Sequence, residues 1–303
     1  MERKLWPSAL LALFCLIAAL AVALIKPKDK RPGQAWAEFP LASLKTLEFQ
    51  SPGRQVTIEP LGANAAWITQ SDDKGPQIFL GGERVRDLWF SLSPLWATKS
   101  LGKVRENKAG EYGLTEANRM FRIVRSEGPT REFVIGSRGF QSSDYFVLDK
   151  AQDKVFLWNR GTIDSLNDPA RLALKTLSFL NPEGLNAIVL SQPEDASRTR
   201  TLVKNSKLWS EAEKPLLSDA PLLNWLLRFS KLTIKGYHAS SSKTVQPLLR
   251  VTFETETRWN LALVYSADDR SYRLQFGPGK PEILLDSTEV SLLWEEWTTG
   301  KLK

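Results

Sequence analysis

Few side chains in this sequence are of the types that carry out enzymatic chemistry. The chain has 303 residues with a single histidine, His238, and a single cysteine, Cys15. One cysteine excludes a disulfide framework and a cysteine-based metal cluster, and one histidine excludes a site built from several imidazoles. Serines follow His238 closely, but a serine nucleophile also needs an acid that orients the histidine and an oxyanion hole. We therefore predict a surface histidine, no catalytic residues and no cofactor.

Other short motifs resemble functional sites but have simpler explanations. Asp72-Asp73, Glu194-Asp195 and Asp268-Asp269 are adjacent acids in turn-like surroundings, where carboxylates diverge into solvent; weak Ca²⁺ binding is the alternative. The segment Gly277–Pro281 lacks the spacing of a phosphate-binding loop, so it predicts a hairpin turn. Gly81-Gly82 predicts a joint between a loop and a helix.

The positive charge is concentrated at the N-terminus. The formal net charge is +7, but residues 1–31 alone hold six basic side chains against two acidic ones. This distribution is typical of a segment that flanks a membrane, and it argues against a nucleic-acid-binding face.

The residues between these charges predict a membrane anchor. Leu5–Ile25 contains no charged residue and, as a helix, is long enough to span a bilayer. Cleavage at a site such as Ala19-Leu20-Ala21 is the alternative. The count of flanking basic residues taken literally places the large domain in the cytoplasm, whereas a lone N-terminal apolar segment is typical of an export signal. We favour a single-pass protein of the inner membrane with a periplasmic domain.

Hydrophobic periodicity predicts an α+β fold after an extended linker at 26–40. Leu47–Phe49 and Val56–Ile58 alternate with period 2 around a Ser-Pro-Gly turn, which predicts a hairpin. Val85, Leu88, Trp89 and Leu92 lie on one face of a helix. Strands are expected at 121–124, 131–135, 145–148 and 155–158, and Asp168-Pro169 has the features of a helix start.

The same order of elements recurs later in the chain. The run from Tyr145 to Leu166 matches a run from Tyr272 to Leu293 at a constant offset of 127 residues. We predict two repeated units, 41–180 and 184–297, each a mostly antiparallel sheet with helices packed on one face.

The motif residues carry a resemblance to a known family. Tyr112-Gly113-Leu114 is followed by a strand that ends in Ile135-Gly136 and then by a strand that begins with Tyr145. This pattern resembles domain-of-unknown-function family 4340. The resemblance implies a membrane segment followed by repeated α+β units, and ABC transporter subunits of the gliding-motility type as partners. The family has no established catalytic residues, and the second unit lacks the Tyr-Gly-Leu turn.

Two tryptophans near the C-terminus are candidate interface residues. Trp294 and Trp297 are three residues apart on an expected helix, where they either face a partner protein or close the core of the second unit. Trp67, Trp89, Trp209 and Trp225 are expected to pack in the interior. The sequence therefore favours a non-enzymatic, membrane-anchored accessory or scaffold protein with partners in the cell envelope. A binding module for an envelope glycan or lipid is the alternative, and an enzyme is the weakest reading.

Overall fold

The computed structural model describes most of the sequence beyond residue 32. The described ranges are 33–38, 40–61, 65–104, 106–140, 142–205, 208–212, 220–238, 245–254, 258–277 and 279–302. The predicted anchor at 1–25 and the linker up to residue 32 lie outside these ranges, as do Trp6 and Cys15. Within the described ranges, no helix is both long enough and apolar enough to cross a membrane. Residues Gln34–Lys303 form one compact unit.

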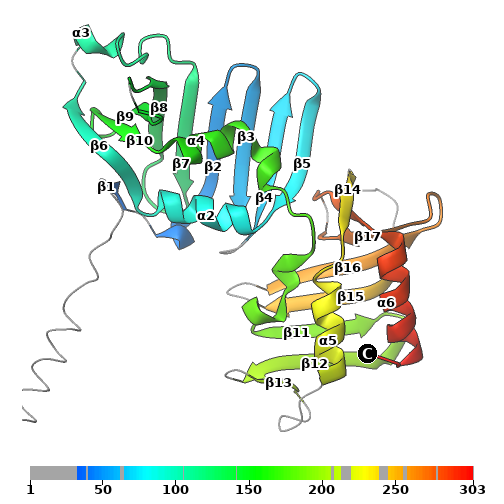
Figure 1. The fold of residues 1–303 in the computed structure, drawn as a ribbon. Coiled ribbons are helices and arrows are strands. Elements are labelled where there is room, and N and C mark those ends of the chain that lie inside the picture. Colours follow the sequence, from blue (N-terminus) through cyan, green and yellow to red (C-terminus); the bar gives the residue numbers. More distant parts are fainter. Residues whose placement is uncertain are drawn as a thin grey trace, which may run out of the picture. The chain divides into compact units, whose positions relative to one another are not determined.

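The first half of this unit is a ten-stranded antiparallel sheet with the strand order β1-β6-β10-β9-β8-β7-β2-β3-β4-β5 (Figure 1). The strands are β1 (Gln34–Ala37), β2 (Leu44–Ser51), β3 (Arg54–Pro60), β4 (Ala66–Asp72), β5 (Gly75–Gly81), β6 (Leu95–Lys103), β7 (Arg119–Arg125), β8 (Arg131–Arg138), β9 (Tyr145–Asp149) and β10 (Lys154–Trp158). The predicted hairpin is β2–β3, and Gly53 at its turn has the positive φ of +68° that a side chain would disfavour.

The second half is an eight-stranded antiparallel sheet with the order β13-β12-β11-β15-β16-β17-β18-β14. The strands are β11 (Ala187–Gln192), β12 (Asp195–Asn205), β13 (Leu208–Glu211), β14 (Ile234–His238), β15 (Pro247–Glu254), β16 (Arg258–Ser266), β17 (Ser271–Gln275) and β18 (Glu282–Leu285). The segment at 277–281 connects β17 to β18, so the predicted hairpin turn is confirmed.

Helices cover one face of each sheet. The α-helices are α2 (Glu83–Leu92), the short α3 (Glu106–Ala109), α4 (Arg160–Asn167), α5 (Ala220–Phe229) and α6 (Ser287–Thr299). The 3₁₀ turns are η1 (Leu41–Ser43), η2 (Pro169–Leu172), η3 (Ser178–Leu180) and η4 (Pro182–Gly184). Helices α2 and α4 pack on the first sheet, and α5 and α6 pack on the second. The described fold is therefore α+β with antiparallel sheets, as predicted.

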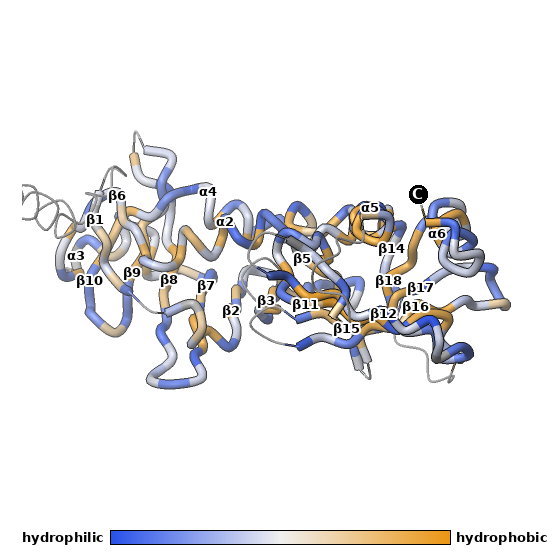
Figure 2. Tube along the Cα trace, turned by 90° about the horizontal axis from the view of Figure 1, so that it is seen from below, coloured by the Kyte–Doolittle hydropathy of each residue, from blue (hydrophilic) through white to orange (hydrophobic). Residues whose placement is uncertain are grey.

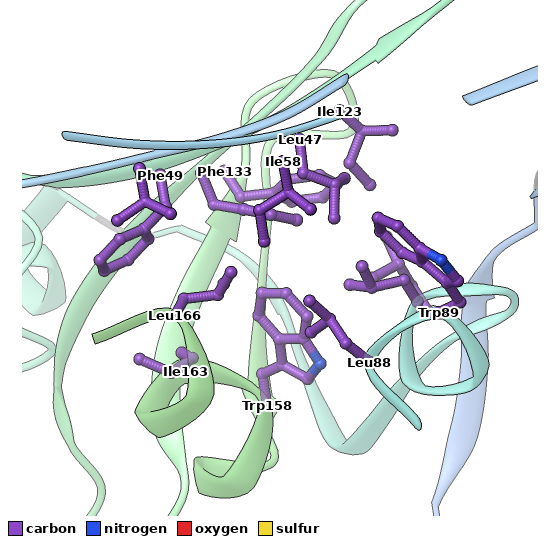
Figure 3. Close-up of a cluster of buried hydrophobic side chains, with 14 of the residues drawn as sticks. Leu47, Phe49, Ile58, Leu88, Trp89, Ile123, Phe133, Trp158, Ile163 and Leu166 are labelled. Atoms are coloured by element: carbon purple, nitrogen blue, oxygen red, sulfur yellow. The ribbon is translucent and has the colours of Figure 1, made fainter. Parts of the chain in front are cut away.

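The core of the first half lies between its sheet and the two helices. The helix residues predicted from periodicity are buried against strand residues of alternating positions. Figure 3 shows Trp158, Leu88 and Ile58 pointing toward one another from β10, α2 and β3. Burying each such side chain stabilises the fold by about 1.5–3 kcal/mol. The opposite face of the sheet is consequently left for other contacts.

The core of the second half is built in the same way. Trp225 of α5 stacks on Phe229 and donates its indole N–H to the carbonyl oxygen of Leu293 in α6, at 2.9 Å. The tube of α5 is mostly hydrophobic in Figure 2, which agrees with its buried position. The four tryptophans expected in the interior, at 67, 89, 209 and 225, are all buried.

The two sheets share one strand order. In the first, β4-β3-β2-β7-β8-β9-β10-β6 lie side by side, and in the second β13-β12-β11-β15-β16-β17-β18-β14 do. Helices α2 and α5 precede the equivalent strands β6 and β14, and α4 and α6 follow β10 and β18. The first sheet adds β5 beyond β4 and β1 beyond β6. This agreement extends over the whole of the smaller sheet, well beyond the segments matched in the sequence.

The segment between the two halves makes hydrogen bonds to both. The amide of Leu174 donates to the carbonyl oxygen of Leu80 in β5, and the amide of Ile234 in β14 donates to the carbonyl oxygen of Lys175. Gly82 lies directly against Leu174, where a Cβ atom would overlap the leucine side chain. Gly82 also caps α2, so the predicted joint between loop and helix is confirmed. The connecting residues thus form isolated backbone bridges to both halves.

One local prediction was wrong, and another was confirmed only in part because Asp168-Pro169 starts a 3₁₀ helix. The predicted linker at 26–40 includes β1, which pairs with β6 and adds an edge strand to the first sheet. Asp168 does not start an α-helix: α4 ends at Asn167, and Pro169 opens only the 3₁₀ turn η2, with no side-chain cap from Asp168. The carboxylate of Asp168 pairs with Arg171 instead, at 2.7 Å. For β1, pairing with a distant strand outweighs the local pattern.

Candidate functional site

The structure brings four of the five motif residues together on the face of the first sheet opposite α2 and α4, called the helix-free face here because neither of these two helices covers it. Tyr112-Gly113-Leu114 belongs to the excursion 104–118 between β6 and β7, which lies against β8. The amide of Ser137 donates to the carbonyl oxygen of Tyr112 at 2.9 Å. A Cβ atom on Gly136 would overlap that oxygen, and Gly113 needs its positive φ of +63°. The motif residues therefore hold the backbone of the excursion at the place where it lies across β8.

Tyr145 lies on the other face of the same strand pair. It is buried among the core residues, where Arg138 donates to its hydroxyl at 3.1 Å and the Arg119 guanidinium lies 4.9 Å from the ring centre. Its neighbour Phe146 points to the helix-free face and packs on the Tyr112 ring, with centroids 4.6 Å apart. The five motif residues consequently support one region of the sheet from both sides.

The two candidate interface tryptophans have different surroundings. Trp297 is only 6% exposed and packs on Trp225 in the core of the second half, at a centroid distance of 5.3 Å. Trp297 therefore closes that core, which was one of the two roles predicted for it, the other being contact with a partner protein. Trp294 is half-buried at the edge of the same core. The exposed apolar residue of α6 is Leu292, which is 61% exposed.

A polar pocket of about 240 Å³ lies on the helix-free face of the second sheet. Strands β16, β17 and β18 form its floor. Its lining residues are Val245, Val264, Ser266, Asp268, Asp269, Arg273, Gln275 and Glu282. Three carboxylates and one guanidinium make the lining acidic, and two valines give it an apolar part. Such a lining suits a basic or mixed side chain of a partner better than an anion.

Arg273 organises this pocket. Its Nη1 donates to Glu282 at 2.9 Å, its Nη2 donates to Asp269, and its Nε donates to the hydroxyl of Ser271 at 3.1 Å. Gln275 donates to the second oxygen of Glu282 at 2.9 Å. The side chains of Arg273 and Glu282 are only 16% and 3% exposed. A buried charge needs this degree of hydrogen bonding to be tolerated, so the network is rigid.

The electrostatics of the network favour its charged form. Hydrogen bonds from Ser271 and Ser266, followed by that from Arg273, hold the pKa of Asp269 well below its ordinary value of 3.8. The hydrogen bond to Glu282 raises the pKa of Arg273, which therefore stays protonated. The network supplies a fixed pattern of charges on a sheet surface.

The two sheets, which share one strand order, differ at this place. At the offset of 127 residues, Arg273, Gln275 and Glu282 correspond to Phe146, Leu148 and Val155, which lie at the same positions of β9 and β10. In the first sheet these positions are apolar, and Tyr112 packs on Phe146. In the second sheet the excursion 104–118 is replaced by the shorter connection 239–246, of which 239–244 lies outside the described residues. The pocket thus corresponds to the region that the Tyr-Gly-Leu excursion covers in the first sheet.

The remaining candidates have structural roles. His238 ends the edge strand β14, is exposed, and lies opposite Glu282 in the register. Asp72 accepts hydrogen bonds from the Lys74 amide and the Gln70 side chain, and Asp195 pairs with Arg198 at 3.0 Å. Among the described residues, no three histidine, cysteine or acidic side chains are grouped so that they can hold a metal ion.

Sequence reasoning missed the Arg273 network, although a signal for it was present. The alternation in Tyr272–Phe276 places Arg273 and Gln275 on one face of β17, and a turn-rich segment separates this strand from Glu282. A hairpin therefore brings the three side chains to one face. What the sequence did not reveal is how deeply Glu282 is buried.

Comparisons with known proteins add no family. The chain matches no family model, and no curated protein matches it. The resemblance to domain-of-unknown-function family 4340 accordingly stays a prediction that rests on the motif residues.

Proposed function

We propose that the protein is a non-enzymatic, membrane-anchored accessory protein that presents its sheets to a partner protein in the cell envelope. Residues 1–25 are the anchor, and the body beyond them faces the periplasm. An ABC transporter is the partner that the family resemblance implies. We further propose that the two halves arose by duplication, which their common strand order supports.

The observation that carries this proposal is the difference between the two helix-free sheet faces. The first is covered by the Tyr112 excursion, whereas the second has a rigid, charged pocket at the equivalent positions. After a duplication, one copy retains a structural covering while the other is free to acquire a contact surface. Its preorganised charges give specificity to a protein partner at little entropic cost.

A charge reversal at the rim of the pocket tests this function. Asp268 lines the pocket and is exposed, and Asp73 is an exposed acid in a turn of the first sheet. Full-length protein is purified from native membranes in mild detergent, and the co-purifying proteins are identified by mass spectrometry. We expect a stoichiometric membrane partner with the unchanged chain and with Asp73→Lys, and its loss with Asp268→Lys.

The outcome is decisive only if both variants fold. Equal circular dichroism spectra and melting temperatures for the two variants establish that. Retention of the partner by Asp268→Lys would remove the pocket from the contact surface. Purification of the unchanged chain without any partner would contradict a stable complex.

A further inference from the structure

Phe140 is the most exposed of the large apolar side chains in the described residues. It lies in the connection between β8 and β9 and is 91% exposed. A single exposed apolar residue needs no explanation by itself. The residues near Phe140 and its position relative to the start of the body indicate a role for it.

The connection that carries Phe140 is firmly held. The amide of Gly139 donates to the carbonyl oxygen of Asp144 at 2.8 Å, and the amide of Asp144 donates to the Ser142 hydroxyl at 3.1 Å. Thr98 of β6 donates to the Asp144 carboxylate at 2.6 Å. Gly139 also packs on the side chain of Leu157. Gly139 and Asp144, on either side of Phe140 in the chain, are therefore held in place beside β6.

This turn lies where the chain arrives from the predicted anchor. Thr98 follows Ala97, and Ala97 is the partner of Gln34, the first residue of β1. Only residues 26–33 separate Gln34 from Ile25, the end of the charge-free segment. Nine Cα–Cα steps join Ile25 to Gln34 and span at most about 32 Å when fully extended, so the start of β1 stays within that distance of the end of the charge-free segment.

Three exposed basic side chains lie on the elements that flank the connection that carries Phe140, together with the carboxylates of Asp144 and Asp164. Arg138 precedes Phe140 closely and is exposed, and so is Lys99, whose strand partner is Leu157. Arg160 at the start of α4 is also exposed and pairs with Asp164, which lies 4.0 Å from Arg138. An exposed aromatic residue with lysine and arginine residues nearby in the fold is the combination found at the boundary between lipid headgroups and acyl chains.

We propose that Phe140, with Lys99, Arg138 and Arg160, forms a face that contacts the lipid bilayer in which the chain is anchored. This inference rests on the proposed membrane anchor. Phe140 enters the headgroup region, and the cations contact lipid phosphates. The contact fixes the orientation of the body on the membrane and leaves the pocket of the second sheet to a protein partner.

Depth-dependent quenching tests this inference on the full chain. In a Cys15→Ser background, Phe140→Cys carries an environment-sensitive fluorophore, and Leu292→Cys on α6 carries the same label as the matched exposed control. Both proteins are reconstituted into vesicles of phosphatidylcholine and phosphatidylglycerol that contain lipids with nitroxides on their acyl chains. We expect a blue-shifted, strongly quenched label at position 140 and an unshifted, unquenched label at position 292.

The experiment distinguishes a wrong prediction of the anchor from a wrong proposal of the lipid contact. If the protein floats with the vesicles but the label at 140 is as water-exposed as that at 292, the contact face is refuted and the anchor stands. A label at 140 that is shielded only in native membranes, and not in vesicles, indicates a protein partner and also refutes the lipid contact. Protein that does not float refutes both the anchor and the contact.

Discussion

At the scale of single residues, Arg273 shows how a charged group becomes part of a sheet. Each of its side-chain nitrogens has an acceptor, and both oxygens of Glu282 have donors. Replacing such a network with apolar residues often causes no loss of stability. The equivalent positions of the first sheet hold the apolar residues Phe146 and Leu148. The charges therefore contribute a specific surface rather than extra stability.

Breaking the network from one side is expected to be costly. We predict that Glu282→Ala lowers the free energy of unfolding by about 3–5 kcal/mol, because the buried Arg273 loses a partner. The matched control is Glu254→Ala in β15, whose exposed carboxylate lies 3.8 Å from Arg258. That variant should lose no more than about 1 kcal/mol. Urea unfolding followed by tryptophan fluorescence measures both, and equal losses would show that the Glu282 network has no special role.

At the scale of elements, the excursion 104–118 is a fixed part of the first sheet. Its contact with β8 depends on Gly136, because a Cβ atom there would overlap Tyr112. We predict that Gly136→Ala destabilises the protein by about 1–3 kcal/mol, the usual range for overpacking.

The control for this prediction is a glycine of the second sheet. Gly236 in β14 also lies within a strand, without a positive φ, and nothing lies within 4 Å of a Cβ atom built on it. Gly236→Ala should leave the stability unchanged or raise it slightly. Thermal unfolding compares the two variants. A neutral Gly136→Ala would mean that Tyr112 lifts readily from the sheet.

Elements with strong periodic patterns were predictable from the sequence. Strands β2, β3, β7, β8, β9 and β10 and helix α2 were all found at the expected places, because their apolar residues match the periods of strands and helices. Strand β1 was missed, since four residues in a proline-rich segment give no pattern and their stability comes from pairing with β6. The burial of Trp297 and Glu282 depends on packing between elements, which one sequence does not reveal.

At the scale of the whole molecule, the body contains two sheets of one strand order that are linked directly to each other. The connecting residues around Leu174 and Lys175 make backbone hydrogen bonds to both halves. Contacts such as that of Lys280 with Glu59, at 2.8 Å, and of Trp67 with Phe276 add to this link. The two halves of the body should thus be presented to a partner together.

The central claim is that residues 1–25 hold this body on a membrane, and extraction of native membranes with alkaline carbonate tests it most directly. We predict that the full chain stays in the membrane pellet, whereas a variant that lacks residues 1–25 appears in the soluble fraction with the same melting temperature. A full chain that carbonate releases, or a short mature form found free in solution, would contradict the account.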